Sequence, residues 1–298
     1  MEPVLLDKLI KDFIYFEEFG DGKSLNTIKS FKKDLGQLRD YLGRKENINN
    51  PKDIKEMALR GFLVELQKEN IGKRSLNRKI SSLRTFFKYL KNHGHIEKNP
   101  TILLTGPAFK AELPEILTKD EIDRIRDVID TKKTNGIRDR LIVELLYSSG
   151  IRTGELLSLG ESVFDMEKRQ LRVKGGKQPR IVFFSERSRE YLKRYVESKK
   201  KKYGEKYTED ILFVNGSGTR ISDRSLRRIV ERYAKKAEIE KEISPHTFRH
   251  TFGVYMLTHG MSLMHLQELM GHVSVESTKI YEEFVNKPKI LKGYNNYL

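Results

Sequence analysis

The amino-acid sequence predicts a mainly α-helical protein of two domains, a small helical bundle followed by a larger helical domain that contains a small antiparallel sheet. Apolar residues recur at steps of three and four along most of the chain, which is the period of an amphipathic helix. Prolines and glycines interrupt this pattern near residue 110. Between Gln170 and Phe184 a strand pattern is broken by Gly175-Gly176 and then resumes, which predicts a hairpin.

The first hundred residues carry four helical patterns and no strand pattern. Apolar residues line one face of Ser24–Gly43 and one face of Ser75–Leu90, and weaker patterns cover Val4–Phe16 and Ile54–Gln67. Polar turns separate these segments. We therefore expect residues 1–105 to form a four-helix bundle with a core of its own.

A linker and a second domain are expected after the bundle. Residues 106–113 begin with Gly106-Pro107 and end directly before Pro114. A new helix is expected to begin at Thr118, where the acids that follow suit the positive end of a helix. Residues 114–284 then contain helices and the hairpin. Residues 285–298 form a tail whose apolar side chains lack an obvious partner within the chain, and these are Ile290, Leu291, Tyr294 and Tyr297. We expect this tail to dock onto a neighbouring subunit.

The composition excludes several classes of protein. The chain has no cysteine, so disulfides, thiolate metal sites and thiol nucleophiles are excluded. No stretch approaches the roughly 20 apolar residues of a membrane span, and the first residues lack the layout of a signal peptide, so we expect a cytoplasmic protein. Lysines and arginines number 58 against 42 acids, a net charge of +16, which indicates a polyanionic partner such as nucleic acid.

Polar residues that could take part in catalysis lie in the second domain. In SPHTFRHTF, Ser244 is a plausible N-cap, and His246 and Arg249 are three residues apart on the helix that follows, so both can face one pocket. In GIRTGELLSL, Arg152 falls at a break between two apolar helical runs, and Glu155 can brace its orientation. Lys174 stands at the lip of the hairpin turn, where its long side chain can reach outward.

A histidine and a tyrosine near the end of the second domain complete this set. Gly271 predicts the end of a short helix, which places His272 just beyond it, and Ser274 can begin the next helix. Tyr281 follows His272 by nine residues, and along one straight helix that offset would be about 13.5 Å on opposite faces. The two side chains can meet only if the chain bends between them, and the stop at Gly271 permits such a bend.

These residue types are those that phosphoryl transfer without a metal requires. A hydroxyl attacks phosphorus, and two arginines clamp the non-bridging oxygens as charge spreads in the transition state. A general base must help Tyr281, because a phenol with a pKa near 10 is protonated at neutral pH. A general acid must protonate the departing 5′-oxygen. A phosphotyrosine stores the bond energy, so the step is reversible without ATP.

The sequence resembles the tyrosine recombinase, or phage-type integrase, family. GIRTGELLSL is similar to the family's first arginine box, HTFRHTF to its His-x-x-Arg box and LMGHVSVESTKIY to its Gly-His and tyrosine box. The front domain is similar to the family's core-binding domain in SLNTIKSFKKDL and SLNRKISSLRTFFKYLKNHGHIEKNP. Length and the absence of an arm-binding domain most resemble the Xer subgroup.

The resemblance implies a role for each of these residues. Tyr281 is the nucleophile that forms a 3′-phosphotyrosyl link, His246 is the general base and Lys174 is the general acid. Arg152 and Arg249 bind the scissile phosphate, and His272 supports the transition state. Glu155 holds the side chain of Arg152 in its orientation. After Lys174 the sequence reads GGKQPR, one residue longer than the usual spacing to the next arginine, and Phe183 stands where proline is common. Lys177 is therefore the alternative to Lys174. We interpret His250, next to Arg249, as a packing residue.

The resemblance also implies a fold and partners. The front domain is expected to be SAM-like and the second domain to have the DNA breaking-rejoining fold. Four protomers, from one protein or a pair of homologues, are expected to recombine two specific sites in duplex DNA without metal or cofactor. The biological task is expected to be chromosome-dimer resolution or the integration and excision of a mobile element. Whether a septal DNA translocase activates the protein is left open by the resemblance. A tyrosine-type topoisomerase and a non-catalytic DNA-binding accessory protein are the alternative functions.

Contacts to DNA are expected from two basic helical segments. The polar side of Ser75–Leu90 carries Arg78, Lys79, Arg84 and Lys88, and the segment SDRSLRRIV carries Arg224 and Arg227. An ordinary solvated face is the alternative interpretation of both segments.

Overall fold

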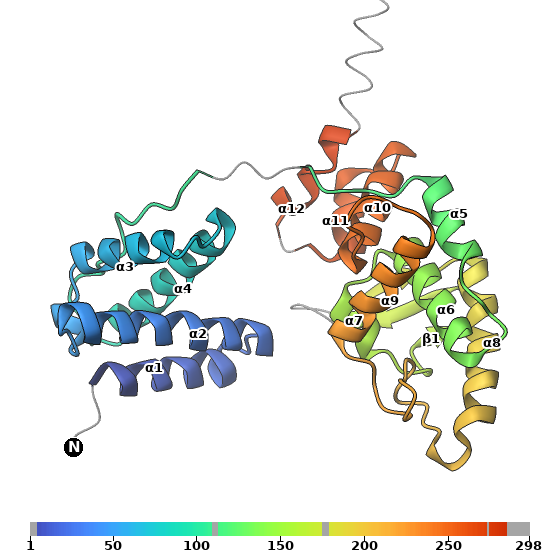
Figure 1. Cartoon of the computed structure of the whole chain (residues 1–298), viewed down its shortest axis with the longest axis horizontal. Helices are drawn as coiled ribbons and strands as arrows, with labels where there is room; N and C mark the ends of the chain where they lie inside the picture. The colour runs from blue at the N-terminus through green and yellow to red at the C-terminus, as the bar shows by residue number, and fades with distance from the viewer. Residues whose placement is uncertain (1–4, 109–112, 175–178, 273, 285–298) are drawn as a thin grey trace, which may run out of the picture. The chain divides into compact units, whose positions relative to one another are not determined.

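The protein folds into two compact units, Met1–Ala111 and Glu112–Leu298. The computed structural model describes residues 5–108, 113–174, 179–272 and 274–284. Among these residues helices dominate both units, and a three-stranded antiparallel sheet lies in the second (Figure 1). The fold class expected from the sequence is therefore confirmed.

The described part of the first unit is a bundle of the four α-helices that the sequence predicts. Its elements are α1 (Leu5–Tyr15), η1 (Phe16–Gly20), α2 (Leu25–Tyr41), η2 (Leu42–Glu46), η3 (Pro51–Asp53), α3 (Glu56–Lys68) and α4 (Lys73–Asn92). Ser24 caps α2, since its hydroxyl accepts a hydrogen bond from the Thr27 amide over 3.2 Å. The apolar faces meet in one core, where the ring of Phe13 lies 5.2 Å from that of Phe31 and 5.3 Å from that of Phe86.

One expectation for α4 is wrong, because Lys79 does not lie on a solvated basic face. Lys79 is only 3% exposed, and its ammonium group donates to a carboxylate oxygen of Asp34 on α2 over 2.9 Å. The same carboxylate accepts hydrogen bonds from Arg78 and from the hydroxyl of Ser82. Asp34 is 1% exposed, and a buried carboxylate needs partners of opposite charge. Lys79 is therefore withdrawn as a DNA contact.

Replacing Asp34 with alanine is expected to destabilise the first unit by about 3–5 kcal/mol, because it leaves the buried ammonium of Lys79 without its counter-charge. Urea unfolding followed by circular dichroism measures this loss. Asp40→Ala on the same helix is the control, because Asp40 pairs with Arg39 at an exposed site, where an ion pair contributes about 0–1 kcal/mol. Equal losses in the two variants would contradict the role assigned to Asp34.

The second unit is built around a helix that is buried on nearly all sides. Its described elements are α5 (Lys119–Asp127), α6 (Thr134–Ser149), α7 (Thr153–Ser158), β1 (Phe164–Asp165), β2 (Gln170–Val173), β3 (Arg180–Phe183), α8 (Glu186–Tyr203), η4 (Gly204–Lys206), α9 (Asp223–Lys236), α10 (Pro245–Thr258), α11 (Leu263–Met270) and α12 (Glu276–Lys279). Helix α6 packs against α8, α10 and β3. Its buried residues lie around most of its circumference, as expected for a helix inside a core.

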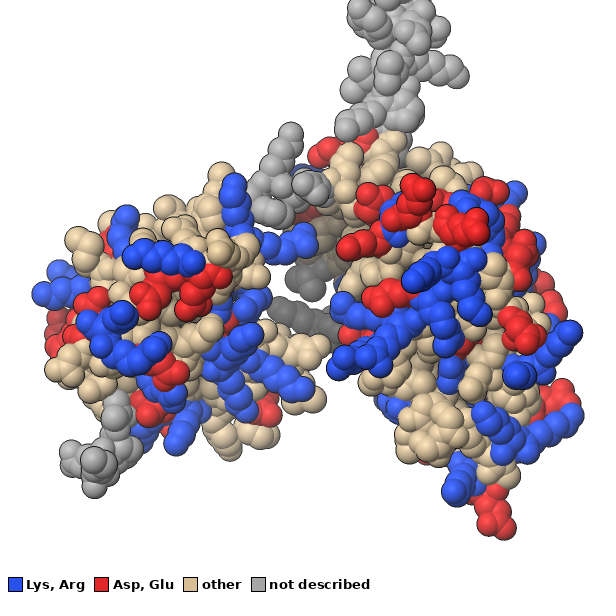
Figure 2. Space-filling view, viewed as in Figure 1, with Lys and Arg blue, Asp and Glu red and all other residues tan. Residues whose placement is uncertain are grey.

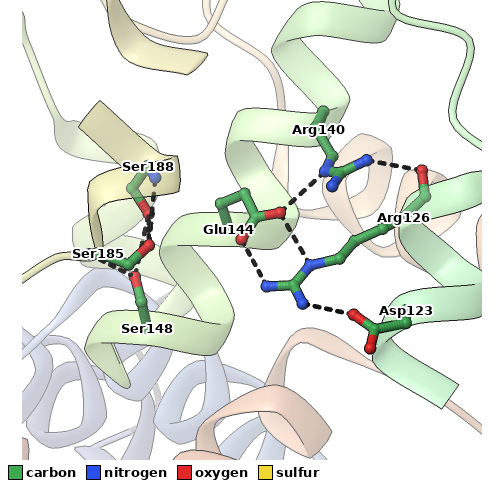
Figure 3. Close-up of polar contacts among 7 residues, drawn as sticks. All are labelled: Asp123, Arg126, Arg140, Glu144, Ser148, Ser185 and Ser188. Atoms are coloured by element: carbon green, nitrogen blue, oxygen red, sulfur yellow. Dashed lines mark hydrogen bonds and ion pairs between the residues drawn. The ribbon is translucent and has the colours of Figure 1, made fainter. Parts of the chain in front are cut away.

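Charged residues inside this core are fully paired. Glu144 on α6 is 0% exposed and accepts two hydrogen bonds from Arg126 on α5, over 2.9 and 2.7 Å, and one from Arg140 over 2.9 Å (Figure 3). Arg126 also binds Asp123 over 2.7 Å. These contacts join α5 to α6, and so fix the start of the second unit to its central helix.

The sheet has the order β1-β2-β3, and the predicted hairpin forms its second and third strands. In the hairpin Gln170 pairs with Phe183 and Val173 pairs with Arg180. The sequence pattern did not predict β1, which has only two residues. In the part of the chain that the structure describes, no helix has the length and apolar character needed to span a membrane.

Candidate active site

The first part of the site is the junction between α6 and α7. Helix α6 ends at Gly150, whose φ of 58° is left-handed, and the chain then places Arg152 at the N-cap of α7. Glu155 in the first turn of α7 accepts a hydrogen bond from the Arg152 guanidinium over 2.9 Å and another from the Arg152 amide over 2.9 Å. Glu155 therefore braces Arg152, as the sequence predicted.

A second arginine, which the sequence motifs did not indicate as part of the site, shares this carboxylate. Arg180, the first residue of β3, donates to the two oxygens of Glu155 over 2.5 and 2.8 Å. Its Nε atom donates to the carbonyl of Leu269 over 2.9 Å. Arg180 therefore connects the hairpin to α7 and to the end of α11.

Helix α10 supplies a third arginine. Ser244 caps this helix, Pro245 occupies its first turn, and Arg249 follows on the side that faces the core. Arg249 is 5% exposed and donates hydrogen bonds to the carbonyl of Gly150 and, over 2.6 Å, to the carbonyl of Met270. Burial and the neighbouring Arg152 lower the pKa of Arg249 to about 10, so it remains a cation at neutral pH.

The three arginines meet at the carboxyl end of α11. The carbonyls of Leu269, Met270 and Gly271 accept hydrogen bonds from Arg180, Arg249 and Arg152 respectively. The last carbonyls of a helix lack partners within the helix and carry partial negative charge, so they hold cations well. Three guanidinium groups from three distant segments are thereby brought together, as an anionic ligand such as a phosphodiester requires.

The chain then bends at Gly271, whose φ of 62° ends α11, and brings His272 close to Tyr281. The ring centroids of His272 and Tyr281 are 6.4 Å apart. The His272 Nδ1 atom lies 2.8 Å from the hydroxyl of the buried Thr278. The bend that the sequence required is present, although α12 begins at Glu276 rather than at Ser274.

Tyr281 is enclosed by α10. It is only 1% exposed, and its hydroxyl lies 3.0 Å from Nδ1 of His250. A Cβ atom at Gly253 would lie 2.7 Å from the Tyr281 ring, so only glycine leaves room for this ring. The expectation that His250 is a packing residue is incomplete, because its ring contacts the hydroxyl of the tyrosine. Burial raises the pKa of Tyr281, while the Arg249 cation opposes the rise.

The imidazoles of His272 and His250 are neutral at neutral pH. Burial and the Arg249 and Arg152 cations lower the pKa of His272 to about 4. Burial, His246 and Arg249 lower the pKa of His250 to about 4. The pKa of His246 is also lowered, by desolvation and by the Arg227 and Arg249 cations. Neutral imidazoles retain a free ring nitrogen that can accept a proton.

Two predicted residues lie at the rim of this arrangement. His246, in the first turn of α10, is exposed. Lys174 is also exposed and directly follows β2, next to the pair formed by Val173 and Arg180. Lys177, the alternative to Lys174, lies outside the described residues.

The basic residues predicted to contact DNA differ in their exposure. Arg224 and Arg227 are exposed on α9, where Lys and Arg side chains gather on the surface of the second unit (Figure 2). Arg227 forms an ion pair with Asp223 over 2.9 Å. In the first unit Arg84 and Lys88 are exposed on α4, and Arg84 donates to the carbonyl of Leu104.

Comparison with protein families places both units in known classes. A model described as the phage integrase family matches residues 115–286, and one described as the N-terminal SAM-like domain of phage integrases matches residues 16–94. "Tyrosine recombinase XerC" of Thermodesulfovibrio yellowstonii is 36% identical over 278 residues, which cover 91% of this chain and 90% of that protein. "Tyrosine recombinase XerD" of Listeria innocua is 31% identical over 294 residues, which cover 98% of this chain and 99% of that protein.

Solved structures share the fold. The crystal structure of XerA recombinase is similar with a TM-score of 0.51 at 27% identity, covering 92% of each chain. XerH site-specific recombinase bound to palindromic difH substrate, in a post-cleavage complex, has a TM-score of 0.75 at 22% identity, covering 97% of this chain and 83% of that one.

Proposed function

Because the chain belongs to the phage integrase family, the tyrosine recombinases, as its motifs predicted, we propose that it is a site-specific recombinase that cuts and rejoins duplex DNA. The observation that carries this proposal is the meeting of Arg152, Arg180 and Arg249 at the end of α11, beside the hydroxyl-bearing ring of Tyr281. A cluster of cations beside one phenol is suited to a phosphodiester that a tyrosine attacks.

The roles that the resemblance implies for these residues give the following proposed reaction. Arg152 and Arg249 bind the non-bridging oxygens of the scissile phosphate, and His272 supports the charge that develops there. The Tyr281 hydroxyl gives its proton to a general base, the role that the resemblance implies for His246. The Tyr281 oxygen bonds to phosphorus as the bond to the 5′-oxygen breaks, which leaves a 3′-phosphotyrosine. Lys174 protonates the leaving 5′-oxygen. Attack of a 5′-hydroxyl on the phosphotyrosine reverses these steps and rejoins the strand.

Two basic surfaces are proposed to contact the DNA backbone. On α9, Arg224 and Arg227 are exposed, and Arg227 is close enough to lower the pKa of His246, so this surface adjoins the site. On α4, Arg78, Arg84 and Lys88 remain candidates. Binding through phosphates would make affinity fall steeply with salt.

The biological task is proposed from the relatives. Chromosome-dimer resolution, or integration and excision of a mobile element, by four cytoplasmic protomers on two DNA sites is consistent with the relatives named XerC and XerD. The tail at residues 285–298, which we expect to dock onto a neighbouring subunit, lies outside the described residues. A homologous second subunit and a septal DNA translocase are further partners to test.

Covalent capture tests the proposed function. The protein is incubated with pooled duplexes of randomised sequence that carry one nick, so that a short cleaved fragment is lost and the phosphotyrosyl product is trapped. We expect a denaturation-resistant adduct on a narrow set of sequences, with its DNA attached to Tyr281 in the mapped peptide. An adduct on another residue, or none across the pool, would overturn the proposal. Relaxation of supercoiled plasmid without any site preference would instead identify a topoisomerase.

A further inference from the structure

The hydroxyl of Tyr281 has a close partner outside the set of residues assigned above. His250 Nδ1 lies 3.0 Å from it, and the two ring centroids are 5.8 Å apart at an interplanar angle of 61°. His250 lies on α10 directly after Arg249 and one turn after His246. An imidazole nitrogen at this distance is within reach of the phenolic proton.

The surroundings of Tyr281 restrict where its proton can go. Its ring is enclosed by Gly253, whose Cα leaves no space for a side chain, and by the ring of His272. Tyr281 as a whole is 1% exposed, so bulk water has little access to it. The Nδ1 atom of His272 lies 2.8 Å from the Thr278 hydroxyl. The described proton acceptor within hydrogen-bond distance of the Tyr281 hydroxyl is therefore Nδ1 of His250.

We propose that His250 is a further catalytic residue, which accepts the proton of the Tyr281 hydroxyl as that oxygen attacks the scissile phosphorus. This inference rests on the proposed function. In the forward step the bond between the Tyr281 oxygen and phosphorus forms, the bond from phosphorus to the 5′-oxygen breaks, and the phenolic proton moves to Nδ1 of His250. The proton returns to Tyr281 when a 5′-hydroxyl displaces it and the strand is rejoined.

The charge state of His250 suits this role in part. With a pKa lowered to about 4 the ring is neutral at neutral pH, and in the tautomer protonated at Nε2 its Nδ1 accepts a hydrogen bond. Such a ring is a weak base for a phenol. Burial is the largest cause of the lowered pKa, and the Arg249 cation adds to it. The negative phosphodiester that binds Arg249 would offset the contribution of that cation. Bound DNA is therefore expected to make His250 more basic when the proton is transferred.

His246 occupies a different position. It is exposed in the first turn of α10, next to the basic residues of α9, and Arg227 is among the charges that act on it. His246 therefore lies beside the α9 surface that is proposed above to contact the DNA backbone. The resemblance implied that His246 is the general base. We assign proton transfer from Tyr281 to His250 instead, because its Nδ1 atom lies within hydrogen-bond distance of the phenol.

The test compares His250→Asn with the wild-type protein in single-turnover formation of the covalent adduct, on the nicked duplex selected by the capture experiment. The asparagine oxygen can accept the Tyr281 hydrogen bond but cannot take up its proton. We expect the adduct to form about 10²–10⁴-fold more slowly, with DNA affinity unchanged. His265→Asn on α11, an exposed histidine, is the matched control and is expected to match the wild type.

A tyrosine analogue separates proton transfer from positioning. Fluorinated tyrosine at position 281 has a more acidic phenol and needs less help from a base. We expect it to restore the rate of His250→Asn at least about tenfold while changing the rate of the wild-type protein much less. The same analogue should also raise the rate of adduct formation by His250→Ala. This second variant keeps the test valid if the asparagine side chain of His250→Asn disturbs the packing.

The outcomes distinguish this inference from the proposed function. If the wild-type protein forms the Tyr281 adduct and His250→Asn does so within about threefold of its rate, the inference is overturned and the proposed function stands. A slow variant that the fluorinated tyrosine does not accelerate would also overturn it, since His250 would then only position the ring. Absence of an adduct in the wild-type protein would refute the proposed function itself.

Discussion

Replacing Tyr281 with phenylalanine is expected to reduce covalent cleavage of DNA by at least about 10⁴-fold, because the variant keeps the ring but lacks the attacking oxygen. The phenylalanine ring fits the same slot against Gly253. Among the described residues, the substitution removes the hydrogen bond to His250, which costs about 1 kcal/mol of stability. DNA affinity should be unchanged. Adduct formation on denaturing gels and a binding isotherm measure the two quantities separately.

Tyr255→Phe is the matched control for this experiment. Tyr255 lies on α10, like the residues that enclose Tyr281, but it is 44% exposed and stacks on His259 at a ring distance of 3.9 Å. We expect this variant to cleave at the wild-type rate. Persistent adduct in Tyr281→Phe would show that another residue is the nucleophile, and the mechanism proposed above would then be wrong.

Much of the site could be predicted because local signals determine where its helices begin and end. The cap formed by Ser244 and the stop at Gly271 are both present in the structure, and they bring Arg249 and His272 to the same place. Such signals act within one turn of a helix, so a single sequence reveals them. The brace between Glu155 and Arg152 is equally local, three residues apart.

The contacts that the sequence did not reveal all join distant segments. Arg180 reaches Glu155 only because β3 pairs with β2 in a register that puts Arg180 opposite Val173, and the turn length alone does not determine that register. The available signal was the alternation of the strand. Val173 faces inward, and the residue paired with it on β3, Arg180, must point to the same face of the sheet. His250 meets Tyr281 across 31 residues, which no helical period connects.

The misassignment of Lys79 has a similar cause. A helical period separates apolar from polar faces, but it does not indicate when a neighbouring helix presents a buried carboxylate. Asp34 on α2 recruits Lys79 and Ser82 from the polar side of α4 into the core of the bundle. Aspartate within an otherwise apolar helix face was the available signal, because such a group needs cationic or hydroxyl partners.

Removing the carboxylate of Glu155 is expected to affect both stability and catalysis. Glu155 is 5% exposed and holds the guanidinium groups of Arg152 and Arg180, so Glu155→Ala leaves two cations near each other without a counter-charge. Breaking a buried ion pair from one side costs about 3–5 kcal/mol. Since Arg152 also loses its orientation toward the phosphate, we expect adduct formation to slow by about 10²-fold.

The pH dependence of stability tests the same carboxylate. Burial raises the pKa of Glu155, but hydrogen bonds from Arg180 and from the Arg152 amide outweigh burial, so the pKa lies below its ordinary value. A carboxyl whose pKa is lowered by folding contributes stability above its unfolded pKa, and that contribution is lost as pH falls through the folded-state pKa. The stability difference between the wild type and Glu155→Gln should therefore be complete at pH 7 and shrink below about pH 4.

Urea unfolding between pH 7 and pH 3 measures this difference, and Glu186→Gln provides the control. Glu186 pairs with Arg189 three residues away, as Glu155 does with Arg152, but its side chain is 59% exposed. An exposed pair of this kind contributes about 0–1 kcal/mol, so the control should lose little stability at any pH. If both variants lost the same amount, or if the Glu155 difference did not begin to shrink below about pH 4, the ion pairs of Glu155 would not be what stabilises the arginine cluster.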